Sequence, residues 1–230
     1  MTMTTATPYH PLRTLPLQIC EQIAQPILEG VFVPGERLRE TELAESFGVS
    51  RATIREAVRL LEQRGLVRIQ PQRGTYVTQL SVKELDDLFE IRASLLATGS
   101  RLAAARCDGP GKERLAACLA RLQAGVGDLQ AYVAASGAMI DCIVQMSGND
   151  ILMHYVSDFA QRIGRYVRMG LLREERRRHS LVTWNRLADA LARGDGEAAA
   201  VIHRKLALDN RGAALEVFLA DQAAPRRASA

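Results

Sequence analysis

The segment 40–77 constrains the fold of this chain most strongly, because two kinds of hydrophobic periodicity follow each other in it. In its first part the apolar residues recur at helical spacing, and Gly48-Val49 makes a tight turn between two short helices. Ser50 occupies the N-cap position of the second helix. After Gly65 the residues alternate as in strands, on both sides of a turn at 71–74. This order predicts a helix-turn-helix followed by a two-stranded wing.

The second helix of this motif has a buried face and an outer face. Ile54, Val58 and Leu61 follow the i, i+4, i+7 rule and predict the buried face. The outer face carries two arginines, Arg51 and Arg55, whose forks can bind guanine edges when such a helix enters the major groove of DNA. At the tip of the wing, Arg73 and the backbone of Gly74 are candidates for contacts with phosphate or the minor groove. The alternative is a generic three-helix domain with an incidental hairpin.

Composition sets broad limits on fold and location. The chain has 230 residues and 47% hydrophobic content, enough for two modest domains or one large one. Its net charge is only +4, so a DNA-binding function depends on where the arginines lie and not on total charge. Four cysteines form no CxxC pair, which favours reduced thiols. No run of about 18 apolar residues and no signal-peptide pattern occur, so we expect a cytoplasmic protein with no membrane partner.

The chain is predicted to be mainly α, with an N-terminal winged helix-turn-helix of three helices and a two-stranded wing, followed by an all-α bundle. The first helix of the winged domain covers 15–29, with Pro26 in its final turn or at a kink. The predicted boundaries are a disordered tail at 1–14, the winged domain at 15–78, a linker at 79–81, the helical domain at 82–220 and a loose tail at 221–230.

The helical domain is predicted to begin at a capping box, in which Ser81 and Glu84 satisfy free backbone amides at the start of a helix. In that first helix we expect large apolar residues to face inward: Leu85, Leu88, Ile91, Leu95 and Leu102. Periodicity and capping residues predict helices over 82–106, 112–124, 129–146, 150–170, 174–193 and 196–219. No strand pattern occurs after Val77.

The stretch from Pro34 to Val67 resembles the winged-helix domain of the GntR family of bacterial transcription regulators. Thr53-Ile54 stands where the family commonly has Pro-Val, which is a tolerated departure. The resemblance implies that Arg51 and Arg55 make the main DNA contacts, with support from other residues of the motif. The complete candidate set for DNA binding is Thr41, Ser50, Arg51, Thr53, Arg55, Arg73 and Gly74.

Three later segments, starting at Phe89, Ser147 and Leu187, resemble the C-terminal effector domain, called FCD, of the FadR-like branch of that family. Many members of the branch hold a metal ion with an Asp-x-x-x-His pair and two further histidines. Counting from the matching segments, the corresponding positions here are Ser136, Ile140, Trp184 and Leu206. Such residues are poor metal ligands, so we predict that the usual metal is absent and that no cofactor is bound.

The resemblance therefore implies an apolar effector pocket, lined in part by those four positions and suited to an organic effector. Arg92 matches an arginine of the family's first effector helix, and Arg165 is a second candidate for capturing a carboxylate. The alternatives are helix-core packing without any cavity at these positions and, for Arg165, a solvated helix face. The run 173–178 is predicted to be solvated, with local Glu–Arg pairs. A displaced metal site is a further alternative, formed by His154, His179 and His203.

The resulting hypothesis is a homodimeric transcription regulator, with repression as the commoner mode in the family. Two copies of the winged domain would bind a near-palindromic operator, and a small organic effector, with a carboxylate as one possibility, would change their relative placement. One alternative is a DNA-binding regulator or architectural protein whose helical domain only dimerises and senses no ligand. An enzyme is not expected, because the sequence has no nucleophile elbow, HExxH motif or phosphate loop.

Overall fold

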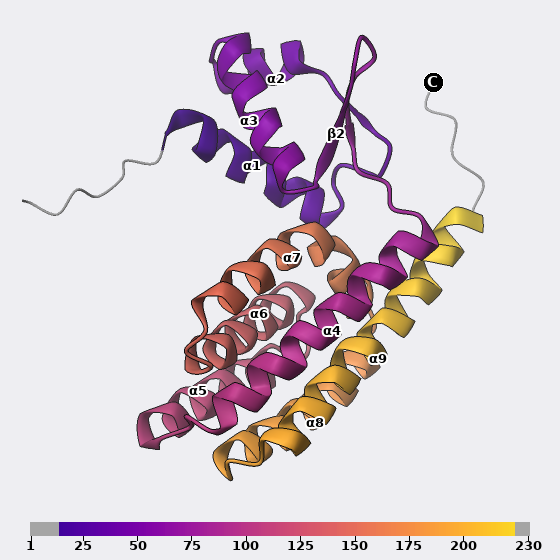
Figure 1. Ribbon diagram of the computed structural model, residues 1–230. Helices are drawn as coiled ribbons and strands as arrows, with labels where there is room; N and C mark the ends of the chain where they lie inside the picture. The colour runs from indigo at the N-terminus through magenta and orange to yellow at the C-terminus, as the bar shows by residue number, and fades with distance from the viewer. Residues whose placement is uncertain (1–13, 224–230) are drawn as a thin grey trace, which may run out of the picture. The chain divides into compact units, whose positions relative to one another are not determined.

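The computed structural model describes residues 14–223 (Figure 1). The chain divides into two compact units with the boundary between Thr78 and Gln79. The predicted fold class is confirmed, because an N-terminal winged helix-turn-helix precedes a unit that is helical throughout its described part. The predicted tails at 1–13 and 224–230 lie outside the described residues, whereas 221–223 continue the last helix and do not belong to a tail.

The N-terminal unit contains three helices and three strands. These are α1 (Leu15–Glu29), β1 (Arg37–Leu38), α2 (Glu40–Phe47), α3 (Arg51–Gln63), β2 (Val67–Gln70) and β3 (Gly74–Val77). The strands form an antiparallel sheet in the order β1-β3-β2, with Leu38 paired to Thr75 and Ile69 paired to Thr75 from the other side. The sequence predicted only β2 and β3. β1 escaped that prediction because two residues are too few to show alternation.

The core of the N-terminal unit forms between α1 and α3. Ile23 and Ile27 of α1 pack in one cluster with Ile54 and Leu61 of α3, and all four are buried. Pro26 lies in the last turn of α1, which ends at Gly30 in the left-handed conformation. The packing fixes the rotation of α3, so the opposite face of this helix points to solvent.

The second unit contains six helices in the described part of the chain. They are α4 (Val82–Ala104), α5 (Gly109–Gly125), α6 (Leu129–Met146), α7 (Asp150–Met169), α8 (Glu174–Ala192) and α9 (Gly196–Ala223). The predicted capping box starts α4, since the Ser81 hydroxyl accepts from the Glu84 amide at 3.1 Å and the Glu84 carboxylate accepts from the Ser81 amide at 2.8 Å. Asp128 and Asn149 cap α6 and α7 without a reciprocal bond, because each side chain accepts from the amide three residues later.

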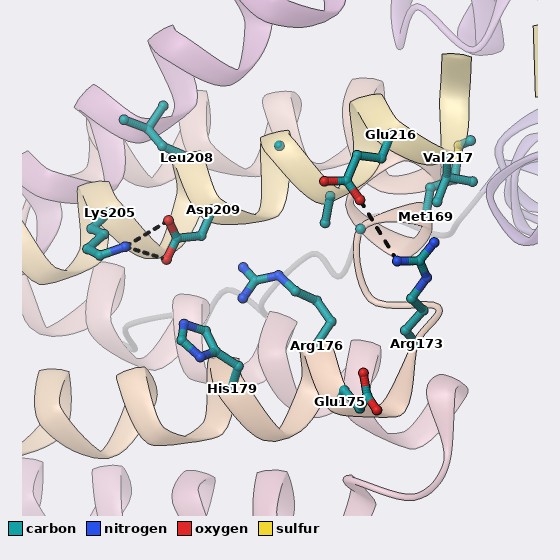
Figure 2. Close-up of a pocket in the computed structure, with 13 residues that line it drawn as sticks. Met169, Arg173, Glu175, Arg176, His179, Lys205, Leu208, Asp209, Glu216 and Val217 are labelled. Atoms are coloured by element: carbon teal, nitrogen blue, oxygen red, sulfur yellow. Dashed lines mark hydrogen bonds and ion pairs between the residues drawn. The ribbon is translucent and has the colours of Figure 1, made fainter. Parts of the chain in front are cut away.

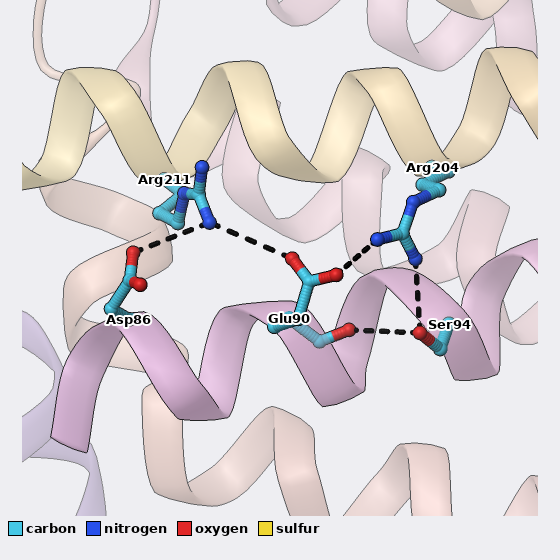
Figure 3. A network of polar contacts seen from close by, with 5 residues as sticks. All are labelled: Asp86, Glu90, Ser94, Arg204 and Arg211. Atoms are coloured by element: carbon cyan, nitrogen blue, oxygen red, sulfur yellow. Dashed lines mark hydrogen bonds and ion pairs between the residues drawn. The ribbon is translucent and has the colours of Figure 1, made fainter. Parts of the chain in front are cut away.

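The first and last helices of this unit, α4 and α9, lie side by side in opposite directions (Figure 1). A row of polar contacts joins them on the outside (Figure 3). Arg211 lies 3.2 Å from Asp86 and 3.6 Å from Glu90, while Arg204 pairs with Glu90 and donates to the Ser94 hydroxyl at 3.0 Å. These contacts close the bundle by joining its two ends in sequence.

The buried face of α4 differs from the predicted one. Leu85 is buried as expected, but Ile91 is 48% exposed, and the buried face runs instead through Phe89, Ala93 and Leu96. The sequence pattern favoured the largest aliphatic residues. Small residues such as Ala93 are buried because neighbouring helices approach α4 closely there.

Among the described helices, α6 alone has the length and hydropathy that a membrane span would need. In this fold it is a core helix, because Tyr132, Met139 and Ile143 are fully buried among the other helices of the bundle. A buried position of this kind accounts for its apolar composition.

Candidate functional site

The recognition helix α3 begins with a cap that leaves its arginines exposed. The Ser50 hydroxyl accepts from the Thr53 amide at 3.1 Å, and the two hydroxyl oxygens lie 2.8 Å apart. Ser50 and Thr53 are thus engaged with each other at the helix start. Arg51 and Arg55 are exposed, and the Arg55 Nε donates to the Glu40 carboxylate of α2 at 3.0 Å. To contact a DNA base or phosphate, the Arg55 guanidinium would therefore have to turn away from Glu40.

The remaining DNA-binding candidates lie at the start of α2 and at the tip of the wing. Thr41 is exposed in the first turn of α2, where backbone amides favour an anion such as a phosphate. The wing turn has two positive φ angles, 62° at Gln72 and 105° at Gly74. Arg73 between them is exposed, and its carbonyl accepts from the Tyr76 hydroxyl at 3.1 Å, which holds the turn.

The helical unit contains a partly open cavity of about 170 Å³ between α4, α6, α7, α8 and α9. Five of the six predicted effector-pocket residues line it: Arg92, Ser136, Ile140, Trp184 and Leu206. The four positions inferred from the family's metal site thus converge on one cavity. Its wall is mainly apolar, with Leu96, Val133, Val167 and Leu171 among the other lining residues.

Four buried polar atoms on this wall have no hydrogen-bond partner among the described residues: Ser136 Oγ, Arg176 Nη2, His203 Nε2 and Asn210 Oδ1. Buried polar atoms in folded proteins are nearly always satisfied, by protein groups or by a bound molecule. Their grouping at one cavity indicates a place where a polar ligand or ordered water completes the hydrogen bonds.

The electrostatics of the cavity are set by Arg92 and His203. Burial lowers the pKa of Arg92 to about 10, and burial together with the nearby Arg92 charge lowers the pKa of His203 to about 3. His203 is therefore neutral at pH 7. Its Nδ1 lies 2.6 Å from the Ser100 hydroxyl, and its ring packs edge-on against Trp184 with 5.4 Å between centroids. These contacts fix the ring with Nε2 toward the cavity.

The structure corrects two of the arginine assignments made from the sequence. Arg165 is not among the residues that line the cavity; Arg176 lines it instead. The run 173–178 was predicted to be solvated, but Arg177 is only 4% exposed and Arg176 is half-buried. A sequence signal existed for Arg177, because it continues the buried stripe of α8 at the spacing of Leu181 and Trp184.

The described residues contain no group of three or more histidine, cysteine or acidic side chains that could hold a metal ion. The three histidines of the helical unit lie in different surroundings. His154 is exposed and lies 3.4 Å from Asp158, His179 lines a separate surface groove, and His203 lines the cavity. They do not come together as the displaced metal site would require.

That surface groove, of about 580 Å³, is open to solvent and lies between the start of α8 and α9 (Figure 2). Its charges are mixed: the Lys205 ammonium lies 2.8 Å from the Asp209 carboxylate, and Arg173 lies 3.9 Å from Glu216. Arg176 lines both this groove and the inner cavity. It therefore stands in the wall that separates the two.

A winged helix-turn-helix joined to a helical unit with a cavity is the architecture of a DNA-binding transcription regulator with an effector domain. The model of "Bacterial regulatory proteins, gntR family" matches residues 15–77, and the model of the FCD domain matches residues 87–207. The chain therefore belongs to the GntR family of bacterial transcription regulators and carries an FCD effector domain.

Curated relatives agree with this assignment. Over 89 residues the chain is 46% identical to the uncharacterized HTH-type transcriptional regulator YdhC of Bacillus subtilis (strain 168). The matched region covers 39% of this chain and 37% of that protein. The chain is 34% identical over 102 residues to the transcriptional repressor RspR of Escherichia coli (strain K12), covering 44% and 45%. The chain thus spans less than half the length of these two relatives. A match to the Nta operon transcriptional regulator of Aminobacter aminovorans covers 86% of this chain and 97% of that protein at 30% identity.

Solved structures share the fold. McbR/YncC of E. coli superposes with a TM-score of 0.77 at 22% identity, covering 90% of this chain and 100% of that chain. Lar of Listeria monocytogenes gives 0.63 at 21% identity with the same coverage. The family and these relatives are transcription regulators and not enzymes.

Proposed function

We propose that this protein is a cytoplasmic, homodimeric repressor that binds a near-palindromic operator and responds to a small carboxylate in the cavity of its helical domain. The observation that supports the effector most directly is the group of four unpartnered buried polar atoms around that cavity, next to Arg92. Arg92 forms no side-chain hydrogen bond or ion pair with any described residue. A guanidinium fork binds a carboxylate through two parallel charge-assisted hydrogen bonds.

DNA recognition is assigned to Arg51 and Arg55 at the exposed start of α3. Replacing either by Ala should cost about 1–3 kcal/mol of binding free energy and relax sequence preference at its base pair. Fluorescence anisotropy with a labelled fragment from upstream of the gene measures this. Arg178→Ala, an exposed arginine of α8, is the control. Wild-type affinity in both α3 variants would refute the assignment.

Helices α4 and α7 are neighbours in the bundle, and we assign dimerisation to the faces of these two helices that point away from its core. Both expose large apolar side chains: Ile91 is 48% exposed, Ile151 72% and Tyr155 53%. A second copy would bury them, and a two-fold dimer presents two equivalent DNA-binding domains. Sedimentation equilibrium should show a dimer for the wild type and dissociation for an Ile151→Glu, Tyr155→Glu variant. A wild-type monomer at micromolar concentration would refute this part.

Helix α4 connects the effector to DNA binding. It carries Arg92 at the cavity and starts at Val82, close to the unit boundary after Thr78. The segment before it is held to α7, because the Leu80 amide donates to the Tyr166 hydroxyl at 3.4 Å. An effector that prefers one orientation of α4 would bias the placement of the DNA-binding domains by its difference in binding free energy.

The effector proposal is tested by titrating small carboxylates into the protein–DNA complex. We expect a carboxylate to lower the anisotropy signal for the wild type and to have no effect on Arg92→Gln, while both bind DNA equally without it. Arg178→Gln, an exposed arginine of α8 that pairs with Glu174 of the same helix, is the matched control. If no carboxylate binds the wild-type protein or changes its DNA affinity, the helical domain serves dimerisation alone.

A further inference from the structure

We propose that the effector is a small dicarboxylate with a hydroxyl group, held between the guanidinium groups of Arg92 and Arg176. This inference rests on the proposed effector function and specifies the chemical class of the ligand. It goes beyond a single carboxylate contact at Arg92, because it gives Arg176 an equal role.

The cavity presents two guanidinium groups to anionic parts of a ligand. Arg92 and Arg176 both line it, and no aspartate or glutamate is among the described residues of its wall. Neither arginine side chain has a hydrogen bond or ion pair with a described residue, and Arg176 Nη2 is fully buried. An unpaired charge is costly to bury, so Arg92 favours an anionic group inside the cavity, and the buried Nη2 of Arg176 offers hydrogen-bond donors to a second anionic group at the groove side.

The uncharged polar atoms on the cavity wall favour a ligand that carries a hydroxyl group. The Asn210 Nδ2 donates to the Val167 carbonyl at 3.2 Å, which fixes the orientation of the amide and leaves Oδ1 as the unpartnered acceptor. An acceptor needs a donor, and a carboxylate has none. A hydroxyl on the ligand would supply it, while Ser136 Oγ and His203 Nε2 can donate to the ligand's oxygens.

The size of the cavity limits the length of the ligand. An apolar protein cavity of about 150 Å³ holds one benzene molecule, so the volume of about 170 Å³ here fits about seven non-hydrogen atoms. A four-carbon dicarboxylate is close to that size, and its outer carboxylate would extend past the cavity toward Arg176. Long acyl chains, sugars phosphorylated at both ends and nucleotides are too large.

Arg176 lies where a ligand would enter. It lines the cavity and also the open groove between α8 and α9, into which its guanidinium extends beside the Lys205–Asp209 pair (Figure 2). A dicarboxylate entering from the groove would meet Arg176 first and Arg92 inside. Arg173 offers a matched control, because it lines only the groove and is 75% exposed.

Isothermal titration calorimetry on the full chain tests the inference with four probes: malate, succinate, 3-hydroxybutyrate and butyrate. We expect malate to bind most tightly and each dicarboxylate to bind at least about tenfold more tightly than its monocarboxylate counterpart. Arg176→Gln should weaken malate binding about 10- to 100-fold and remove that preference, while changing 3-hydroxybutyrate binding less than about twofold. Arg92→Gln should weaken both, Arg176→Lys should give an intermediate loss because it keeps the charge without the fork, and Arg173→Gln should match the wild type.

Different failures overturn different parts. Equal binding of mono- and dicarboxylates, or a preference that survives Arg176→Gln, refutes the dicarboxylate inference and leaves a carboxylate effector in place. Loss of malate binding in Arg173→Gln as large as in Arg176→Gln would move the site to the outer groove and refute it as well. If none of the four probes binds the wild type, both the inference and the proposed carboxylate effector are wrong. Thermal melts of each variant confirm that it is folded.

Discussion

Replacing Arg177 by Met should destabilise the helical domain by about 3–5 kcal/mol. Its guanidinium donates to four backbone carbonyls: from Nε to Val126 at 2.7 Å, from Nη1 to Leu171 at 2.9 Å and Leu172 at 2.8 Å, and from Nη2 to Gly127 at 3.2 Å. The bond to Leu171 is buried and the other three are partly buried. A buried carbonyl that loses its donor costs about 1–3 kcal/mol, and three that water can reach cost about 0.5–1 kcal/mol each.

Urea unfolding followed by tryptophan fluorescence measures this effect in the helical domain alone, because Trp184 is the single tryptophan of the chain and is 4% exposed. With a denaturant slope of about 2 kcal/mol per molar urea, the midpoint should fall by about 1.5–2.5 M. Arg178→Met is the control, since Arg178 forms only an exposed i, i+4 pair with Glu174, worth about 0.5 kcal/mol. An Arg177→Met midpoint within about 0.3 M of this control would show that the four hydrogen bonds of Arg177 do not stabilise the helical domain as inferred.

Three further outcomes are expected. His203 has a pKa of about 3 in the folded domain and 6.5 in the unfolded chain, so the unfolded state takes up the proton first as pH falls. Between pH 7 and 5.5 the wild type should therefore lose about 1.3 kcal/mol more stability than His203→Gln. Urea midpoints of the two proteins that fall in parallel over this pH range would contradict this. Gly170→Ala should lower the stability of the helical domain by about 1–3 kcal/mol, because a Cβ there would overlap the Asn210 side-chain amide. Gly212→Ala has open space around the new Cβ and should stabilise α9 by up to about 1 kcal/mol. Urea unfolding midpoints compare the two variants. Ser50→Ala should lower the melting temperature of the DNA-binding domain, in proportion to about 1 kcal/mol, by removing the cap of α3; an unchanged melt would show that the cap is not needed.

Most helix starts were predictable because capping is local, but α5 was predicted to begin at 112 and begins at Gly109, where the Asp108 carboxylate accepts from the Gly111 amide at 2.7 Å. Asp128 and Asn149 cap α6 and α7 through hydrogen bonds to amides three residues later, so the whole signal lies within four residues of sequence. The same holds for Ser81 and Glu84 at α4. Strand β1 gave no comparable signal, because two residues make a strand only when β3 is present to pair with them.

The position of Arg177 was harder to predict, because its partners are distant in sequence. Val126 lies 51 residues away and belongs to the connection after α5. The spacing to Leu181 and Trp184 placed Arg177 on the buried stripe, but a run of charged residues is normally solvated. Only the folded arrangement of the α5–α6 and α7–α8 connections provides enough carbonyls to bury a guanidinium.

The cavity was predictable in part. The resemblance to FCD domains supplied Ser136, Ile140, Trp184 and Leu206, which lie on three different helices and meet only in the fold. Arg92 came from the same resemblance, but the second arginine at the cavity, Arg176 and not Arg165, could not be derived in this way. That choice depends on the rotation of each helix about its own axis, and the arginine-rich stretches of α7 and α8 look alike in sequence.

The pairing of α4 with α9 sets the order in which the protein can fold during synthesis. Glu90 and Arg204 are 114 residues apart, so at a translation rate of about 10 residues per second α4 waits on the order of ten seconds for its partner. The DNA-binding unit is complete long before that. During the interval the apolar face of α4, with Leu85 and Phe89, is open to chaperones and to other nascent chains. A ribosome that stalls before Gly196 would therefore release a chain with a folded DNA-binding domain and an unfinished bundle.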